Sequence, residues 1–101
     1  PEDYFAKKYN LTRTHSEVIE ATPKFPKGKV LDLGSGEGRN SLYLAKKGFD
    51  VTSLDINSMS LAKLAQIAEA EGLDIDIQPY NIESADIPGG LYDVIISTVV
   101  L

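Results

Sequence analysis

Three glycines alternate along the segment GSGEG at residues 34–38, directly after the apolar stretch KVLDL at 29–33. Glycine tolerates positive φ angles and, lacking a side chain, lets a ligand approach the backbone closely. A glycine turn between a strand and a helix also directs unpaired N–H groups, at the positive end of the helix dipole, into the crevice beyond the strand. The segment therefore predicts a site for a ligand that carries a nucleotide.

The spacing of the glycines separates two kinds of nucleotide site. A dinucleotide fingerprint has the form G-x-G-x-x-G, in which the third glycine allows close helix packing. Here the glycines are Gly34, Gly36 and Gly38, the fingerprint's third glycine is replaced by Arg39, and an acid, Asp32, precedes the turn. This spacing argues against a nicotinamide-dependent oxidoreductase, which stays as an alternative.

Polar residues follow the later strand-like segments as well. Asp55 directly follows the segment DVTSL at 50–54, about 20 residues beyond the glycine turn, where a carboxylate can accept hydrogen bonds from both hydroxyls of a ribose. Asn81 follows the third segment, where its amide suits the edge of an adenine and Ile82 suits its face. Ser97 lies near the end of the last segment, where its backbone can close the other side of the pocket. For Asp55 the alternative is an aspartate of a turn or of a helix N-terminus, which the position at the end of the strand disfavours, whereas Asn81 alone is equally typical of an ordinary loop.

Alternating strand and helix patterns must position these residues. Such alternation predicts an α/β fold with a parallel sheet and right-handed crossovers. Ser58 is the predicted cap of a helix that ends at Gly72, and the apolar stripe of that helix is read as Leu61, Leu64, Ala65 and Ala68. The predicted strands are 29–33, 50–54, 73–80 and 92 to about 100, with a helix at 39–47 and two short helices before residue 28.

The pattern of the strands predicts their places in the sheet. LDIDIQPY at 73–80 alternates apolar and acidic residues, as an edge strand with one wet face does, whereas 29–33 and 92–100 are apolar enough for central positions.

Composition and charge narrow the class of protein. The chain has 101 residues, 43% of them hydrophobic and 25% charged, which suits one small globular domain. A net charge of -5 disfavours nucleic acid as the main partner. Without cysteine there is no disulfide and no thiolate metal site, so no metal is expected. No apolar run of membrane-spanning length and no signal-peptide pattern is present, which predicts a cytoplasmic protein.

Four segments, in this order, resemble the successive cofactor motifs of class I S-adenosylmethionine-dependent methyltransferases: VLDLGSGEG, LDIN with Asp55, YNIE and YDVIIST. KKYNLTRTHSEVIEA at 7–21, GEGRNSLYLAKKGFDV and IISTVVL are similar to the TehB-type tellurite-resistance methyltransferases. The main departure is Ser35, where many relatives carry cysteine. The resemblance implies a Rossmann-like three-layer sandwich with a seven-stranded sheet, of which this chain supplies four strands in the order 3-2-1-4.

The resemblance also implies a cofactor and a reaction. S-adenosyl-L-methionine would donate its methyl group, by in-line displacement, to a small acceptor such as a tellurite or selenite oxyanion, which needs no strong general base. No catalytic residue is assigned, and the single histidine, His15, is read as structural. Arg13 and Arg39 are candidates for a carboxylate or an anionic substrate. The residues expected at the cofactor are Arg13, Gly34, Gly36, Asp55, Ile56, Asn81, Ile82 and Ser97.

The abrupt end of the apolar segment at Leu101 leads to two further expectations. Residues 1–101 are expected to be the N-terminal, cofactor-binding part of a single methyltransferase domain, with helices at 1–27, strand–helix units at 28–101 and the C-terminal part absent. An alternative is a half-domain that binds cofactor or a partner without turnover. An exposed strand at 92–100 would then favour self-association.

Overall fold

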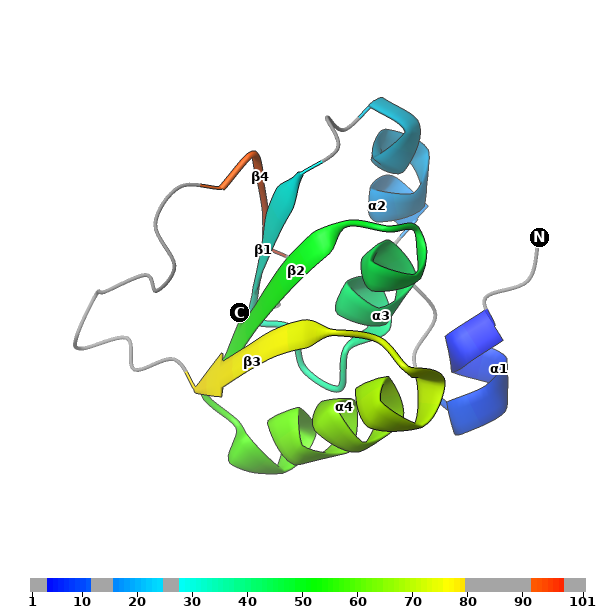
Figure 1. Cartoon of the computed structure of the whole chain (residues 1–101), viewed down its shortest axis with the longest axis vertical. Coiled ribbons are helices and arrows are strands. Elements are labelled where there is room, and N and C mark those ends of the chain that lie inside the picture. The colour runs from blue at the N-terminus through cyan, green and yellow to red at the C-terminus, as the bar shows by residue number, and fades with distance from the viewer. Residues whose placement is uncertain (1–3, 12–15, 25–27, 80–91, 98–101) are drawn as a thin grey trace.

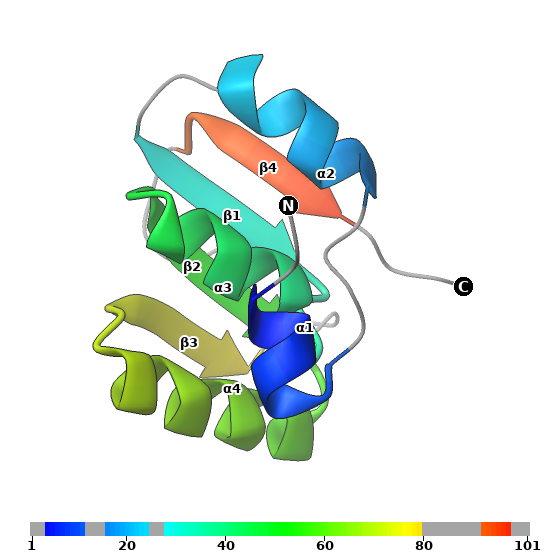
Figure 2. The same cartoon turned by 90° about the vertical axis from the view of Figure 1, so that its right-hand side faces the viewer.

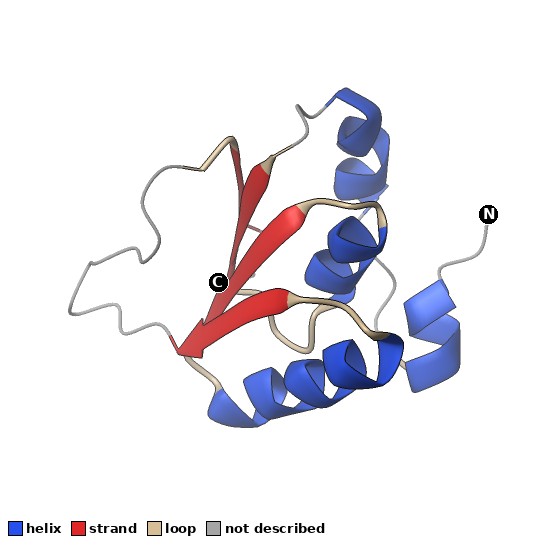
Figure 3. Cartoon of the chain, in the orientation of Figure 1, coloured by secondary structure: helices blue, strands red, loops and turns tan. Residues whose placement is uncertain are grey.

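The computed structural model describes residues 4–11, 16–24, 28–79 and 92–97. Within them, four strands form one parallel sheet in the order β3-β2-β1-β4, which confirms the predicted order (Figure 1). Figure 3 shows the same elements coloured by type. The strands are β1 (Lys29–Leu33), β2 (Asp50–Asp55), β3 (Ile75–Pro79) and β4 (Val94–Ser97), and the helices are α1 (Tyr4–Tyr9), α2 (Ser16–Ala21), α3 (Arg39–Lys46) and α4 (Ser58–Glu71), with a 3-10 turn at Thr22–Lys24.

The helices lie on one face of the sheet, with α2 over β4, α3 over β1 and β2, and α4 beside β3 (Figure 2). The described residues thus form two layers of the predicted sandwich. α1 lies outside α3 and α4, on the side away from the sheet (Figure 1). This arrangement follows from right-handed crossovers, because β1-α3-β2 and β2-α4-β3 step in the same direction across the sheet.

Two apolar clusters fill the space between the layers. Strand residues at alternate positions point to the helices, and helix residues three or four apart meet them. The first cluster joins α1, α3 and α4 and contains Phe5, Leu11, Leu42, Leu64, Ile67 and Ala68. The second joins α2, α3 and the sheet and contains Val18, Val30, Leu44, Phe49 and Val51.

The start and the apolar stripe of α4 differ from prediction. The cap is Asn57, whose backbone is extended and whose side-chain oxygen accepts hydrogen bonds from the N–H groups of Met59 and Ser60. The prediction of Ser58 as the cap is therefore wrong by one residue. Ala65 is exposed, and Ile67 takes its place among the buried residues of the helix.

The edges of the sheet match the sequence pattern in part. β3 is an edge strand, as predicted, and β1 is central. β4 pairs with β1 on one side only within the described residues, although a central position was predicted for it. Ile95, in this strand, is 59% exposed.

Candidate functional site

The glycine turn follows β1 and is fixed against the end of β2. The N–H groups of Gly34 and Ser35 both donate to the carbonyl of Leu54, at 2.8 and 3.0 Å. Leu33 and Leu54 are partners in the parallel register, so the two strands end side by side. The N–H of Gly38 donates to the carbonyl of Ser35 at 3.1 Å and closes the turn.

Gly36 and Gly38 serve different purposes in this turn. A Cβ atom on Gly38 would lie 2.3 Å from Cδ1 of Leu64, so this glycine allows the start of α3 to pack on α4. A Cβ atom on Gly36, whose φ is +58°, would meet nothing within 4 Å. The open side of the turn is therefore at Gly36, where a ligand can reach the backbone.

Asp55 ties the end of β2 to this open side. Its Oδ2 accepts a hydrogen bond from the Gly36 N–H at 2.7 Å, and its Oδ1 accepts one from the Asn57 N–H at 2.7 Å. A carboxylate offers about four acceptor positions, so about two remain for a ligand. The carboxylate is thus held in place by the backbone and keeps capacity for a pair of hydroxyls.

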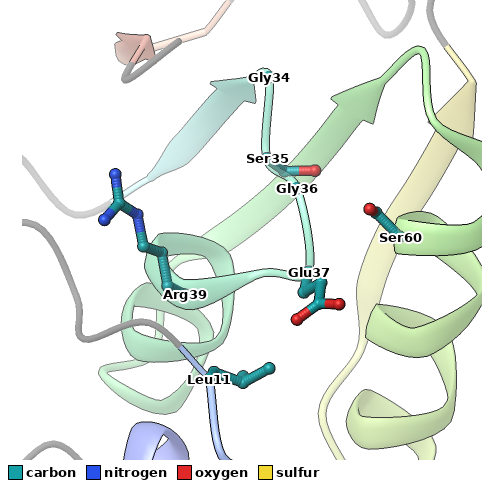
Figure 4. Close-up of a pocket in the computed structure, with 7 residues that line it drawn as sticks. All are labelled: Leu11, Gly34, Ser35, Gly36, Glu37, Arg39 and Ser60. Carbon is teal, nitrogen blue, oxygen red and sulfur yellow. The ribbon is translucent and has the colours of Figure 1, made fainter. Parts of the chain in front are cut away.

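A cavity of about 330 Å³ lies beside the turn. This volume is at the lower end of the range typical of small-molecule sites. In Figure 4 the side chains of Arg39 and Ser60 lie on opposite sides of the turn, and Leu11 lies below Arg39 and Glu37. The cavity is lined by Leu11, Gly34, Ser35, Gly36, Glu37, Arg39 and Ser60.

A buried polar chain lies behind the turn. Asp32 and Ser41 are fully buried; the Ser41 hydroxyl donates to Oδ2 of Asp32 at 2.6 Å and lies 2.5 Å from the Ser53 hydroxyl. Oδ1 of Asp32 is buried without a hydrogen-bond partner in the described part of the chain. Burial raises the pKa of the Asp32 carboxyl to about 6, although the Ser41 hydrogen bond and the charge of Arg39 oppose this.

The structure brings some of the predicted site residues together at the cavity and leaves others elsewhere. Gly34, Gly36 and Arg39 line the cavity, and Asp55 bonds to its wall. Ile56, next to Asp55, is 77% exposed. Ser97 is the register partner of Leu33, immediately before the turn, which places it at the same end of the sheet. Arg13, His15, Asn81 and Ile82 lie outside the described residues, and their roles stay predictions.

Sequence reasoning missed four residues of the cavity wall. Ser35 and Glu37 lie inside the glycine segment, and Ser60 lies in the first turn of α4, so the positions of these three residues in the sequence could have indicated them. Leu11 carried no such signal, because nothing local in the sequence relates it to residues 34–37.

Comparison with known proteins now gives the family. The model of the family described as "Tellurite resistance protein TehB" matches residues 1–101. The chain belongs to the TehB family. Its structure matches the crystal structure of TehB from Haemophilus influenzae with a TM-score of 0.91 and 51% identity, over 97% of this chain and 34% of that one.

Two curated relatives bear on activity. The "Probable S-adenosyl-L-methionine-dependent methyltransferase TehB" of Haemophilus influenzae strain 10810 is 52% identical over 99 residues, which cover 98% of this chain and 34% of that protein. A 23S rRNA (uracil(747)-C(5))-methyltransferase of Pyrococcus abyssi is 44% identical over 73 residues, which cover 71% of this chain and 18% of that protein. The chain spans about a third of the length of the TehB relative.

None of the described helices is both long and apolar enough to cross a membrane.

Proposed function

We propose that residues 1–101 are the cofactor-binding part of a single S-adenosyl-L-methionine-dependent methyltransferase domain, with helices at 1–27 and strand–helix units at 28–101. The observation that carries the proposal is the carboxylate of Asp55, fixed on the Gly36 N–H at the open side of a glycine turn. The name of the 52% identical TehB relative supports the same cofactor.

The residues present fit the two ends of this cofactor. The acceptor positions left on Asp55 suit the two ribose hydroxyls. The bare backbone at Gly34 and Gly36 suits the methionine portion, and Arg39, on the same cavity wall, suits its carboxylate. When bound, the cofactor supplies a methyl group that is already activated by the positive sulfur. The chain's residues then contribute binding and alignment rather than proton transfer.

The same proposal includes a small methyl acceptor. The family description supports a tellurite oxyanion, and selenite is proposed with it because the two oxyanions are chemically alike. The net charge of -5 supports a small-molecule acceptor over nucleic acid, although one relative is an rRNA methyltransferase. The same proposal includes a cytoplasmic location. It also includes further contacts with the cofactor from Arg13, Ile56, Asn81, Ile82 and Ser97. No observation on the described residues favours the nicotinamide alternative.

Calorimetry of the full-length protein with S-adenosylmethionine and its demethylated product tests the assignment. Asp55→Ala removes charge-assisted hydrogen bonds, each contributing about 1.5–3 kcal/mol, so cofactor affinity should fall at least about tenfold. Asp55→Asn keeps one acceptor oxygen and should lose less. Asp50→Asn, at the exposed opposite end of the same strand, is the matched control and should bind as the wild type does. Absence of binding to the wild type at millimolar cofactor would overturn the proposal.

A further inference from the structure

α1 cannot hold its position by its own stability. It has six residues, and isolated helices shorter than about 12 residues are marginal in water. Its place is fixed by tertiary contacts, first of all by Phe5, which is 2% exposed within the cluster that also contains Leu42 and Leu64.

One carboxylate receives three donors from α1. Glu71, the last residue of α4, accepts hydrogen bonds from the hydroxyl of Tyr4 at 3.0 Å, from the ammonium of Lys8 at 2.9 Å and from the hydroxyl of Tyr9. The Glu71 side chain is 9% exposed. The hydrogen bond from Tyr9, followed by that from Lys8, lowers the pKa of Glu71 to about 2, so the acceptor is ionised at neutral pH.

A second contact of α1 comes from the end of α3. The ammonium of Lys46, at the end of α3, lies 4.3 Å from the ring centroid of Tyr4, within the range of a cation–π interaction. α1 is therefore held between the C-terminal ends of α3 and α4.

The end of α1 connects this contact to the cavity. Asn10 has a φ of +58°, and the Leu11 N–H donates to the carbonyl of Ala6 at 3.1 Å, which is the pattern of a Schellman C-cap. This cap turns the chain back, so that Leu11 enters the same apolar cluster as Phe5 and also lines the cavity beside the glycine turn (Figure 4). Leu11 is thus shared by the docking of α1 and by the cavity wall.

We propose that Glu71 is a positioning residue for cofactor binding: it docks α1 and so fixes Leu11 as a wall of the cavity. This inference rests on the proposed function, because it takes the cavity for the cofactor site. Linkage requires the effect to be reciprocal, so a bound cofactor must also strengthen the docking of α1 by the same factor.

The experiment combines two measurements on the full-length protein. Calorimetry gives the Kd of the demethylated cofactor, and hydrogen exchange gives the protection of the α1 amides with and without it. Glu71→Ala should raise the Kd at least about fivefold, a typical lower bound for coupling between sites, and should reduce α1 protection. Tyr9→Phe, which removes one donor hydroxyl, and Glu71→Gln, which keeps an acceptor oxygen, should show smaller effects in the same direction.

Controls separate positioning from general stability. Glu69→Ala changes an exposed carboxylate on the same helix and should leave the Kd within about twofold of wild type. Leu11→Ala should weaken binding, and adding Glu71→Ala to it should add little, because neighbours in one pathway are not additive.

Each outcome decides the inference. Reduced α1 protection in Glu71→Ala with an unchanged Kd overturns it, as does an unchanged protection, because the carboxylate would then not hold α1. Fully additive effects of Glu71→Ala and Leu11→Ala also overturn it. If the wild type itself fails to bind the cofactor, the proposed function has failed. If the wild type binds and Glu71→Ala has the same Kd and the same α1 protection, this inference alone has failed.

Discussion

Gly36 and Gly38 allow one prediction to be worked through, because the same change to alanine meets different surroundings two residues apart. At Gly38, with φ +101°, the new Cβ would lie 2.3 Å from Cδ1 and 3.2 Å from Cγ of Leu64. Leu64 is fully buried in the first cluster, so it can move only by disturbing Leu42 and its other neighbours.

The expected cost at Gly38 has two parts. Overpacking a core contact costs about 1–3 kcal/mol, and a left-handed conformation costs a residue with a Cβ about 1–2 kcal/mol. Gly38→Ala should therefore lower the free energy of unfolding by about 2–5 kcal/mol. Gly36→Ala has the conformational cost only, about 1–2 kcal/mol, since its Cβ meets nothing within 4 Å.

Cofactor affinity should show the opposite order. The methyl group of Gly36→Ala projects into the open side of the turn and should weaken binding at least about tenfold, or about 1.4 kcal/mol. Urea unfolding and calorimetry of the two full-length variants check both quantities. The reasoning is refuted if Gly38→Ala is no less stable than Gly36→Ala, or if Gly36→Ala binds the cofactor as tightly as wild type.

Three further changes test the helix start and the buried chain. Asn57→Ala removes the cap of α4 and should cost about 1 kcal/mol in urea unfolding; an equal loss in the neighbouring Ser58→Ala would contradict the cap assignment. Asp32 has a pKa of about 6 in the folded protein and about 4 in the unfolded chain. Its contribution to stability is therefore greatest below about pH 4 and is lost as the pH rises through about 6. Between pH 4 and pH 8 the free energy of unfolding of the wild type should fall by about 2–3 kcal/mol relative to that of Asp32→Asn. A difference between the two proteins that does not change with pH would contradict the raised pKa. Ser41→Ala leaves Asp32 buried without its donor and should lower the free energy of unfolding by about 1–3 kcal/mol at pH 7. A loss below about 0.5 kcal/mol, the size typical of surface substitutions, would contradict this.

Much of the fold was predictable because its signals are local. β1 occupies the residues predicted for it, α3 ends at Lys46 before Gly48, and α4 ends before Gly72. The parallel sheet followed from the alternating elements, and its order from the family resemblance, in agreement with the edge-like pattern of the third strand. The cap of α4 was misplaced because Asn57 and Ser58 are both residue types that cap helices well. The cap is the residue that keeps an extended backbone before the helix begins, which here is Asn57.

One member of the predicted apolar stripe of α4, Ala65, was wrong for a related reason. Periodicity gives the width of an apolar face, but its centre depends on what covers it. Here Ile67 shares a buried cluster with Phe5 of α1, Ile75 of β3 packs against that cluster, and Ala65 stays exposed. Neither Phe5 nor Ile75 belongs to the segment whose periodicity predicts the helix.

The sequence by itself determined the glycine turn, the acid at the end of the second strand and the parallel sheet that brings them together, because turn chemistry and periodicity act over a few residues. Only the tertiary structure decided that Gly36 is open while Gly38 is packed, and that Leu11 forms a wall of the cavity. The same holds for the contact of Glu71 with α1, which joins residues more than 60 positions apart. Such contacts depend on how whole helices settle on the sheet, and no local pattern records that.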